Sequence, residues 1–213
     1  MSQRATVPRG RHAPPLEVRL SVQRRRLFRA AASVFAGVGY AEASAEAIAR
    51  RAGMSKATFY EHFANKEECI LALFDEAATV VLHAMADAAR DAGSEPRERL
   101  RSGIRAFLDM LAEHPAASQT LLVEIMAAGD RGAERRDSIM AAFAATIDAE
   151  NAAAARSGGL ARLESPDEAF AIVGAVAELA SRQLRLGDPA DIRDLEPVIE
   201  RLMVCLMTPA PAA

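Results

Sequence analysis

Several closely spaced side chains could bind an anionic surface rich in hydrogen-bond acceptors. Lys56 carries a cation, Thr58 and Tyr60 carry hydroxyl groups, and all three follow Ser55, which is suited to begin a helix. A helix N-terminus presents free N–H groups and the positive end of the helix dipole, and both favour phosphate. Lysine also reaches guanine acceptors, while the methyl groups of Ala57 and Thr58 can meet a thymine methyl. We therefore predict that this helix end enters the major groove of DNA.

Other side chains of the same segment are suited to the sugar-phosphate backbone. Tyr60, His62 and Lys66 have the length to donate to phosphate oxygens, which positions a protein without specifying sequence. Glu61 either accepts from a cytosine amine or stays in solvent. The alternative is that these residues only cap and pack a short helix.

The elements that must position these groups are two short helices joined by a tight turn. Ser44 is expected to cap the first, in which Ala45, Ile48, Ala49 and Ala52 form a narrow apolar stripe. Gly53 follows where the chain must leave that helix with positive φ. Met54 is expected to plug the turn. In the second helix Phe59 and Phe63, four residues apart, are expected to face the core.

The pattern IA..AG.SK.TFY.HF..KE, from Ile48 to Glu67, resembles the DNA-binding domain of the TetR family of bacterial transcriptional regulators. The similarity is dense over Leu20 to Phe74 and fades beyond it. The resemblance implies the following DNA contacts, to which the cap Ser55 is added: Ser44, Lys56, Ala57, Thr58, Tyr60, His62 and Lys66. Ala57 stands where many members have glycine, so the backbone is expected to approach DNA slightly less closely.

Charge divides the chain of 213 residues into two parts. Residues 1–66 contain 12 basic and 4 acidic side chains, and residues 67–213 contain 14 basic and 25 acidic ones, which leaves a net charge of −3. A basic segment beside an acidic remainder is expected of a DNA-contacting domain on a non-contacting one. The first 15 residues, rich in Arg and Pro, are expected to be a disordered basic arm. Such an arm either adds DNA contacts or is a solvated leader.

Strand-like alternation is missing, and helical periodicity continues to the end of the chain, so we predict an all-α protein. A helix-turn-helix DNA-binding domain is predicted over 16–65, a helical ligand-binding and dimerisation domain over 66–207, and a flexible tail over 208–213. The predicted helices are 16–38, 44–52, 55–63, 66–90, 94–114, 115–129, 133–156, 165–186 and 191–207.

Neither a secretory segment nor an apolar run of membrane-spanning length is recognised, so a cytoplasmic protein without membrane contact is expected. Cys69 and Cys205 match no metal or disulfide spacing, and each is expected to be a small buried hydrophobe. We find no nucleophile–base pair, metal triad or phosphate loop, so no cofactor, no metal and no enzymatic activity are predicted.

One short recognition helix contacts too few base pairs to select a genomic site, which favours a homodimer on a palindromic operator. The last two predicted helices are suited to pair with their symmetry mates as a four-helix bundle. The last one is apolar on nearly all sides and needs cover from a partner. A purely intramolecular core is the alternative. The predicted dimer residues are Phe170, Val173, Gly174, Ala177, Leu184, Val198, Leu202 and Cys205.

The helices between Phe74 and Ile147 contain methionines and phenylalanines, whose side chains adapt to varied ligands. The resemblance implies that a small molecule binds among them and releases DNA. The predicted ligand residues are Phe74, Met85, Phe107, Met110, Leu111, Glu124, Met126, Met140 and Phe143. His83, His114 and Gln119 are further candidates for polar contacts, although each is more often an ordinary helix residue.

Together these patterns predict a dimeric, sequence-specific transcriptional regulator that binds double-stranded DNA, most simply a repressor released by an unknown apolar or amphipathic effector. An activator of the same fold is an alternative. So is a ligand-responsive module that binds another protein in place of DNA, and steep salt dependence of binding separates that class from DNA binding.

Overall fold

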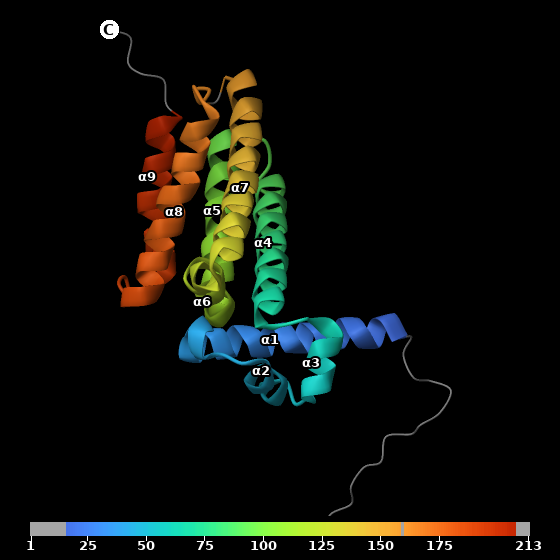
Figure 1. Ribbon diagram of the computed structural model, residues 1–213. Coiled ribbons are helices and arrows are strands. Elements are labelled where there is room, and N and C mark those ends of the chain that lie inside the picture. Colours follow the sequence, from blue (N-terminus) through green and yellow to red (C-terminus); the bar gives the residue numbers. More distant parts are fainter. Residues whose placement is uncertain (1–15, 159, 208–213) are drawn as a thin grey trace, which may run out of the picture.

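The computed structural model describes residues 16–158 and 160–207, in which every regular element is a helix (Figure 1). The predicted arm 1–15 and tail 208–213 lie outside these ranges. The all-α prediction is confirmed. The elements are α1 (Leu16–Glu42), α2 (Ala45–Arg51), α3 (Lys56–His62), α4 (Lys66–Asp91), α5 (Pro96–Glu113), α6 (Pro115–Leu122), the 3-10 helix η1 (Glu124–Ala128), α7 (Asp130–Arg156), α8 (Pro166–Leu186), the 3-10 helix η2 (Ile192–Leu195) and α9 (Glu196–Leu206).

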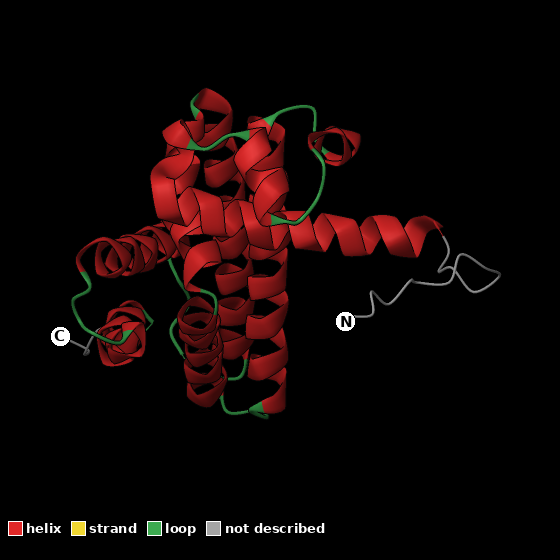
Figure 2. Cartoon of the chain, turned by 90° about the horizontal axis from the view of Figure 1, so that it is seen from below, coloured by secondary structure: helices red, strands yellow, loops and turns green. Residues whose placement is uncertain are grey.

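The helices form two parts, which we call the head (α1–α3) and the body (α4–α9). α1 lies across the lower end of the body, with α2 and α3 on its far side (Figure 1). The body helices run roughly side by side, away from α1. Seen from below, the first part of α1 projects beyond the body (Figure 2). This arrangement leaves α2 and α3 free on the outer side of the molecule.

Local capping explains where the helices begin. Ser44 Oγ accepts from the Ala47 N–H at 3.1 Å, and Ser55 Oγ accepts from the Thr58 N–H at 3.0 Å. Asn65 caps α4 in the same way. Such bonds satisfy N–H groups that have no partner inside the helix. Proline, which has no N–H to lose, opens three other helices, at residues 96, 115 and 166.

Most predicted boundaries agree with the structure within a few residues, and the differences have local causes. α1 extends to Glu42, but Gly39 has φ 79° and ψ 158°, so the regular helix breaks where its end was predicted. The helix predicted over 115–129 is divided into α6 and η1 at Val123. The helix predicted over 191–207 is likewise divided into η2 and α9. α7 begins at Asp130, three residues before its predicted start.

Two glycines are required by the backbone. Gly53, in the turn between α2 and α3, has φ +65°, a conformation that side chains disfavour. Gly132, in the first turn of α7, has an ordinary φ but no space. A Cβ there would lie 2.2 Å from the carbonyl oxygen of Ile125. The turn that joins η1 to α7 therefore depends on glycine for close backbone contact.

The buried apolar residues form two clusters, and α4 belongs to both. The first cluster joins the head to the lower body, and its largest fully buried members include Phe35, Phe59 and Ile70. The second joins α5, α8 and α9 around Leu108 and Ile172. Because α4 supplies Ile70 to the first cluster and Val81 to the second, it connects the head physically to the body.

α4 also corrects an expectation about membranes. The helix Lys66–Asp91 is long and apolar enough to cross a bilayer, by length and composition. No such run was expected. In the structure α4 packs against α1, α5, α6 and α7, so its apolar residues serve the two cores.

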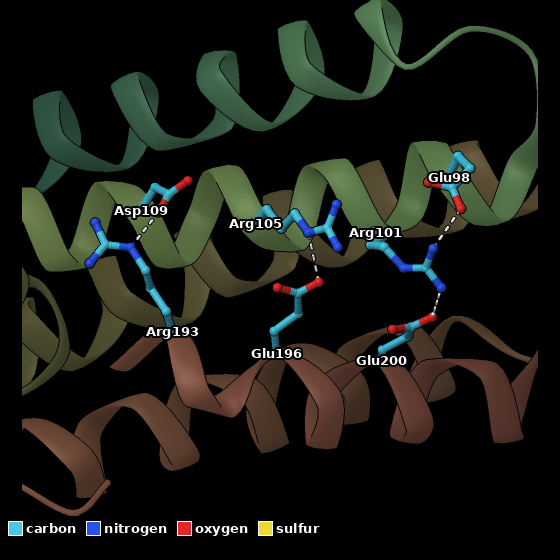
Figure 3. A network of polar contacts seen from close by, with 7 residues as sticks. All are labelled: Glu98, Arg101, Arg105, Asp109, Arg193, Glu196 and Glu200. Atoms are coloured by element: carbon cyan, nitrogen blue, oxygen red, sulfur yellow. Dashed lines mark hydrogen bonds and ion pairs between the residues drawn. The ribbon is translucent and has the colours of Figure 1, made fainter. Parts of the chain in front are cut away.

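On its outer side the body carries a row of ion pairs between α5 and the segment η2–α9 (Figure 3). Arg193 Nε lies 2.5 Å from Asp109, Arg105 Nε lies 2.7 Å from Glu196, and Arg101 Nη2 lies 2.6 Å from Glu200. The α5 members are four residues apart and share one helix face. This ion-pair row holds α9 along α5.

Candidate nucleic-acid interface and ligand cavity

The helix-turn-helix forms as predicted, with its core residues inside and its polar residues outside. Phe59 is fully buried and Phe63 nearly so, and their rings lie 5.5 Å apart. Met54 is half-buried in the turn. The pair of aromatic rings fixes which side of α3 faces outward.

The outward side of α3 presents the predicted DNA-contacting groups. Lys56 and Ala57 are exposed, and Tyr60 is 49% exposed. The Lys56 ammonium lies 6.0 Å from the centre of the Tyr60 ring. Tyr60 in turn meets Phe59 edge-on, so a buried ring supports an exposed one. A cation and a phenol hydroxyl thus stand together at the free end of α3, where they can meet phosphate or base edges.

Ser44, Ser55 and Thr58 take part in the caps of α2 and α3. Ser55 Oγ lies 2.9 Å from Thr58 Oγ1, and both hydroxyls keep acceptor or donor capacity for a ligand. Exposure differs between them, since Ser44 and Ser55 are exposed and Thr58 is half-buried. These residues orient the helix ends at which DNA is predicted to bind.

His62 contacts α1 as well as facing outward. Its Nε2 lies 3.3 Å from Oε1 of Gln23, and the side chain is half-buried. Burial lowers the pKa of His62 below its usual value, and the nearby Arg24 lowers that pKa further, against an opposing effect of Glu61. This lowered pKa favours the neutral imidazole in the free protein.

Lys66 has a different position from the one predicted. Its Nζ donates to the carbonyl oxygens of Tyr40 at 2.8 Å, Ala41 at 2.9 Å and Ala43 at 3.1 Å. It also lies 4.5 Å from the centre of the Tyr40 ring. An ammonium group has three N–H donors, and all three are used inside the protein. In this structure Lys66 therefore holds the end of α1 and has no donor left for phosphate.

Two arginines of α1 have structural roles that the sequence did not reveal. Arg26 Nη2 donates to the Ala52 carbonyl at 2.8 Å, which ties α1 to the turn before α3. The Arg24 guanidinium lies 4.9 Å from the Phe28 ring centre and 5.1 Å from that of Phe63. In the sequence, the only sign of this stacking is the proximity of Arg24 to aromatic positions.

The body contains a cavity of about 430 Å³ between α4, α5, α7, α8 and α9. This volume lies in the range of small-molecule sites, and most of the lining is apolar. Five of the nine predicted ligand residues line it: Phe74, Met85, Phe107, Met140 and Phe143.

The other four predicted ligand residues do not line the cavity. Leu111 is buried in the body core, and Met110 packs against that core. Met126 is 51% exposed on η1. Glu124 accepts from the Tyr40 N–H at 2.9 Å and from Gln119 Nε2 at 3.3 Å. These placements correct the prediction, because each side chain is committed to another contact or faces another direction. His83 and His114, also considered, are exposed outside the lining.

Glu124 joins the lower body to the head. Its carboxylate receives an N–H from the last turn of α1, 84 residues away in the chain. Arg131, in the first turn of α7, pairs with Glu68 at 2.7 Å and Glu67 at 3.3 Å on α4. Leu121, close in sequence to Glu124, lines the cavity. The floor of the cavity is therefore built by elements that also contact the head.

The residues predicted at a dimer surface divide into two groups. Val173 and Ala177 line the cavity, and a Cβ at Gly174 would lie 3.9 Å from Met140, so this part of α8 faces inward. Leu184 and Leu202 are half-buried, and Leu184 packs against the body core. The exposed members are Phe170, Val198 and Cys205.

The two cysteines differ, and one expectation is wrong. Cys69 is fully buried as predicted, and burial raises the pKa of its thiol to about 12. Cys205 is exposed on α9. The last helix is apolar on nearly all sides, so sequence alone did not tell which side faces solvent.

Comparison with known proteins agrees with the geometry of the head. Residues 27–73 match the family described as "Bacterial regulatory proteins, tetR family". The HTH-type transcriptional activator FasR of Mycolicibacterium smegmatis is 35% identical over 102 residues, which are 48% of this chain and 46% of FasR. The chain spans less than half the length of the curated relatives it matches.

Solved structures share the architecture over nearly the whole chain. The fatty acid degradation regulator FadR from Bacillus halodurans has a TM-score of 0.78 at 18% identity, covering 92% of this chain and 97% of that one. The transcriptional regulator FadR from Bacillus subtilis, solved in complex with stearoyl-CoA, has a TM-score of 0.76 at 20% identity, covering 84% and 97%. Residues 27–73 therefore carry the helix-turn-helix of the tetR family of bacterial regulatory proteins, and the chain shares the fold of these solved regulators.

Proposed function

We propose that this protein is a cytoplasmic, homodimeric transcriptional repressor that leaves a palindromic operator when an apolar or amphipathic small molecule enters the body cavity. The observation that carries the proposal is the shared position of α4 and α6. These two helices help to build the floor of the cavity, and they also contact α1 of the head.

DNA binding is assigned to the outward side of α3 and to the caps beside it. The proposed contacts are Ser44, Ser55, Lys56, Ala57, Thr58, Tyr60 and His62. Lys56 is the member with the reach to distinguish bases, and Tyr60 is suited to phosphate. Lys66 is withdrawn from the set because its donors bind carbonyl oxygens of α1.

Dimerisation is supported by apolar side chains that remain exposed on α8 and α9. Phe170 and Val198 are each 41% exposed, and Leu206 is 40% exposed. A second copy that covered this surface with the same helices would form a four-helix bundle. Two heads would then read half-sites about 34–36 Å apart, or a multiple of that distance.

The ligand response follows from a difference in affinity between two conformations of the dimer. A molecule in the cavity would press on Leu121 of α6 and Ile139 of α7, and both pack in or against the apolar cluster that joins the head to the lower body. The ligand can shift the equilibrium between the two conformations only by the difference between its binding free energies for them. The complex of FadR from Bacillus subtilis with stearoyl-CoA supports an effector with a long apolar chain.

An activator is the second candidate, because FasR, a transcriptional activator, shares 35% identity over 102 residues. Promoter fusions separate the two. Deletion of the gene raises transcription from the bound promoter if the protein is a repressor and lowers it if the protein is an activator.

The biochemical test selects genomic fragments that bind the full chain and then screens fatty acids and acyl-CoA thioesters for release of the best fragment. Binding is expected to weaken steeply with salt as counterions are released. Tight binding that no cavity-filling ligand affects would contradict the ligand response. Equal affinity for genomic and random duplexes would contradict operator recognition.

A further inference from the structure

The cavity wall is apolar except for a few side chains, and three of these carry charge. They are Arg99 on α5 and Arg136 and Glu150 on α7. Placing a charge on an apolar cavity costs free energy unless the charge is paired or faces water. Their positions therefore indicate where a polar part of a ligand could lie.

The cavity opens at the end of the body away from the head. Its solvent-exposed lining residues include Ala86 on α4, Ser94 before α5, and Glu150, Ala153 and Ser157 on the second half of α7. These positions belong to the upper ends of α4 and α7 in Figure 1. Its lower end, at Phe74 and Leu121, is closed by buried side chains. The exposed residues at the upper end offer a chain-like ligand an entrance.

Arg99 spans this opening. Its Nη2 lies 2.7 Å from Glu150 Oε2, and its Nη1 donates to the Gly93 carbonyl at 3.3 Å. The Arg99 side chain is 28% exposed, whereas that of Glu150 is 53% exposed. The cation is thus the inner partner of the pair, and the carboxylate is the outer one, which can turn to solvent at little cost.

Given the proposed function of the cavity, we propose that the effector is an anionic amphiphile. Its carboxylate or phosphate head binds Arg99 in place of Glu150, and its apolar tail extends down the cavity toward Phe74. Guanidinium binds carboxylate and phosphate through two parallel N–H donors, which suits an anchor at a cavity opening. While the cavity is empty, Glu150 neutralises the charge of Arg99. It also disfavours the binding of any neutral or anionic molecule that cannot displace it.

Arg136 is the other cationic residue of the lining. It lies near Ile139 and Met140, in the lower part of the cavity. It lies 3.9 Å from Oδ1 of its exposed neighbour Asp137. The side chains of Arg136 and Arg99 are similarly exposed, at 31% and 28%. The choice of Arg99 rests on its ion pair with Glu150, because that carboxylate also lines the cavity and Asp137 does not.

The test compares four ligands with one tail and different heads: dodecanoate, dodecyl phosphate, dodecanol and dodecylammonium. Binding to the full chain is measured by titration calorimetry at neutral pH, below the micellar concentration. The chain has no tryptophan, so calorimetry avoids a reporter mutation. The anions are expected to bind at least about tenfold more tightly than dodecanol, as one charge-assisted pair would provide. A preference for phosphate over carboxylate, or the reverse, identifies the natural head group.

Three variants show which residue causes the preference for anionic ligands. Arg99→Gln is expected to bring dodecanoate to the affinity of dodecanol while dodecanol binding stays unchanged, which also shows that the variant folds. Glu150→Gln is expected to tighten dodecanoate binding several-fold. Arg97→Gln, on the same helix but outside the cavity lining, is the matched control and is expected to behave as wild type.

Two outcomes would overturn the proposed role of Arg99 without overturning the proposed function of the cavity. One is equal binding of all four ligands, and the other is loss of the anion preference in Arg136→Gln but not in Arg99→Gln. Both leave the cavity as a ligand site. Failure of every ligand to bind would instead overturn the proposed function of the cavity together with this inference.

Discussion

The head and the body are built from similar small and apolar residues, yet among the described residues the large cavity lies in the body. In the head, Phe59 and Ile48 are fully buried, and the helix ends are closed by side-chain caps. In the body, small residues such as Ala86 and Ala89 face a cavity of about 430 Å³. The difference agrees with the proposal of a head that holds one shape for DNA and a body that adapts to a ligand.

The largest expected effect on stability comes from removing a phenylalanine ring from the head and, for comparison, one from the body. Phe59→Ala should lower the free energy of unfolding by about 3–5 kcal/mol and abolish DNA binding, because a close-packed ring leaves an unfilled space. Phe143→Ala enlarges a cavity that already exists, so we expect roughly half that cost or less. Urea unfolding followed by circular dichroism measures both. Equal costs would contradict the proposed difference in packing.

The next effect concerns the turn between η1 and α7. Gly132→Ala should lower the free energy of unfolding by about 1–3 kcal/mol, because the new Cβ meets the Ile125 carbonyl and the backbone must move. Gly37→Ala is the matched control in α1, where a Cβ meets nothing within 4 Å. It should stabilise by about 0.5–1 kcal/mol, since alanine favours helix. Thermal unfolding of the two variants distinguishes a steric role from a general effect of glycine removal.

Lys66 and Lys56 give the sharpest comparison within the helix-turn-helix region. Lys66→Ala should lower the free energy of unfolding by about 1–3 kcal/mol, because three carbonyl groups lose a charged donor. Lys56→Ala should change stability by less than about 0.5 kcal/mol but reduce the slope of log affinity against log salt by about 1 and alter base preference. Fluorescence anisotropy with labelled operator measures the slope. A smaller salt slope in Lys66→Ala would return this residue to the DNA-contacting set.

The outer ion-pair row should contribute least, since exposed pairs are weak. The hydrogen bond from Arg101 lowers the pKa of Glu200 below its usual 4.5. A carboxylate whose pKa is lowered by folding stabilises the fold at pH values above its unfolded-state pKa. That stabilisation is lost as the pH falls through its folded-state pKa. Glu200→Gln should therefore be slightly less stable than wild type at neutral pH and equal to it in acid. An unchanged difference across that range, measured by thermal unfolding, would show that the pair does not act through charge.

The head could be predicted closely because its determinants are short-range. Ser44 and Ser55 cap, Gly53 turns, and Phe59 and Phe63 define the inner side within twenty residues of one another. The same local patterns located every body helix. They did not decide that Lys66 would cap α1, because that contact depends on how α4 meets the end of a distant helix.

The site in the body was less predictable because helix rotation is set by tertiary packing. Phe74 and Phe107 were recognised as cavity residues, but Val173 and Ala177 were assigned to a dimer surface and line the cavity instead. α8 and α9 carry apolar residues on several sides, so periodicity does not say which side meets its own chain. Cys205 was expected inside for the same reason and is exposed.

Operator binding by wild type and Tyr60→Ala, measured across salt concentrations with and without an anionic amphiphile, tests the central claim most directly. We expect wild type to prefer a genomic fragment over random duplex, to bind it less tightly as salt rises, and to release it when the ligand binds. Tyr60→Ala should bind every fragment at least about tenfold more weakly yet keep its ligand affinity. Full-strength binding by Tyr60→Ala, or no preference of wild type for any genomic fragment, would contradict the central claim.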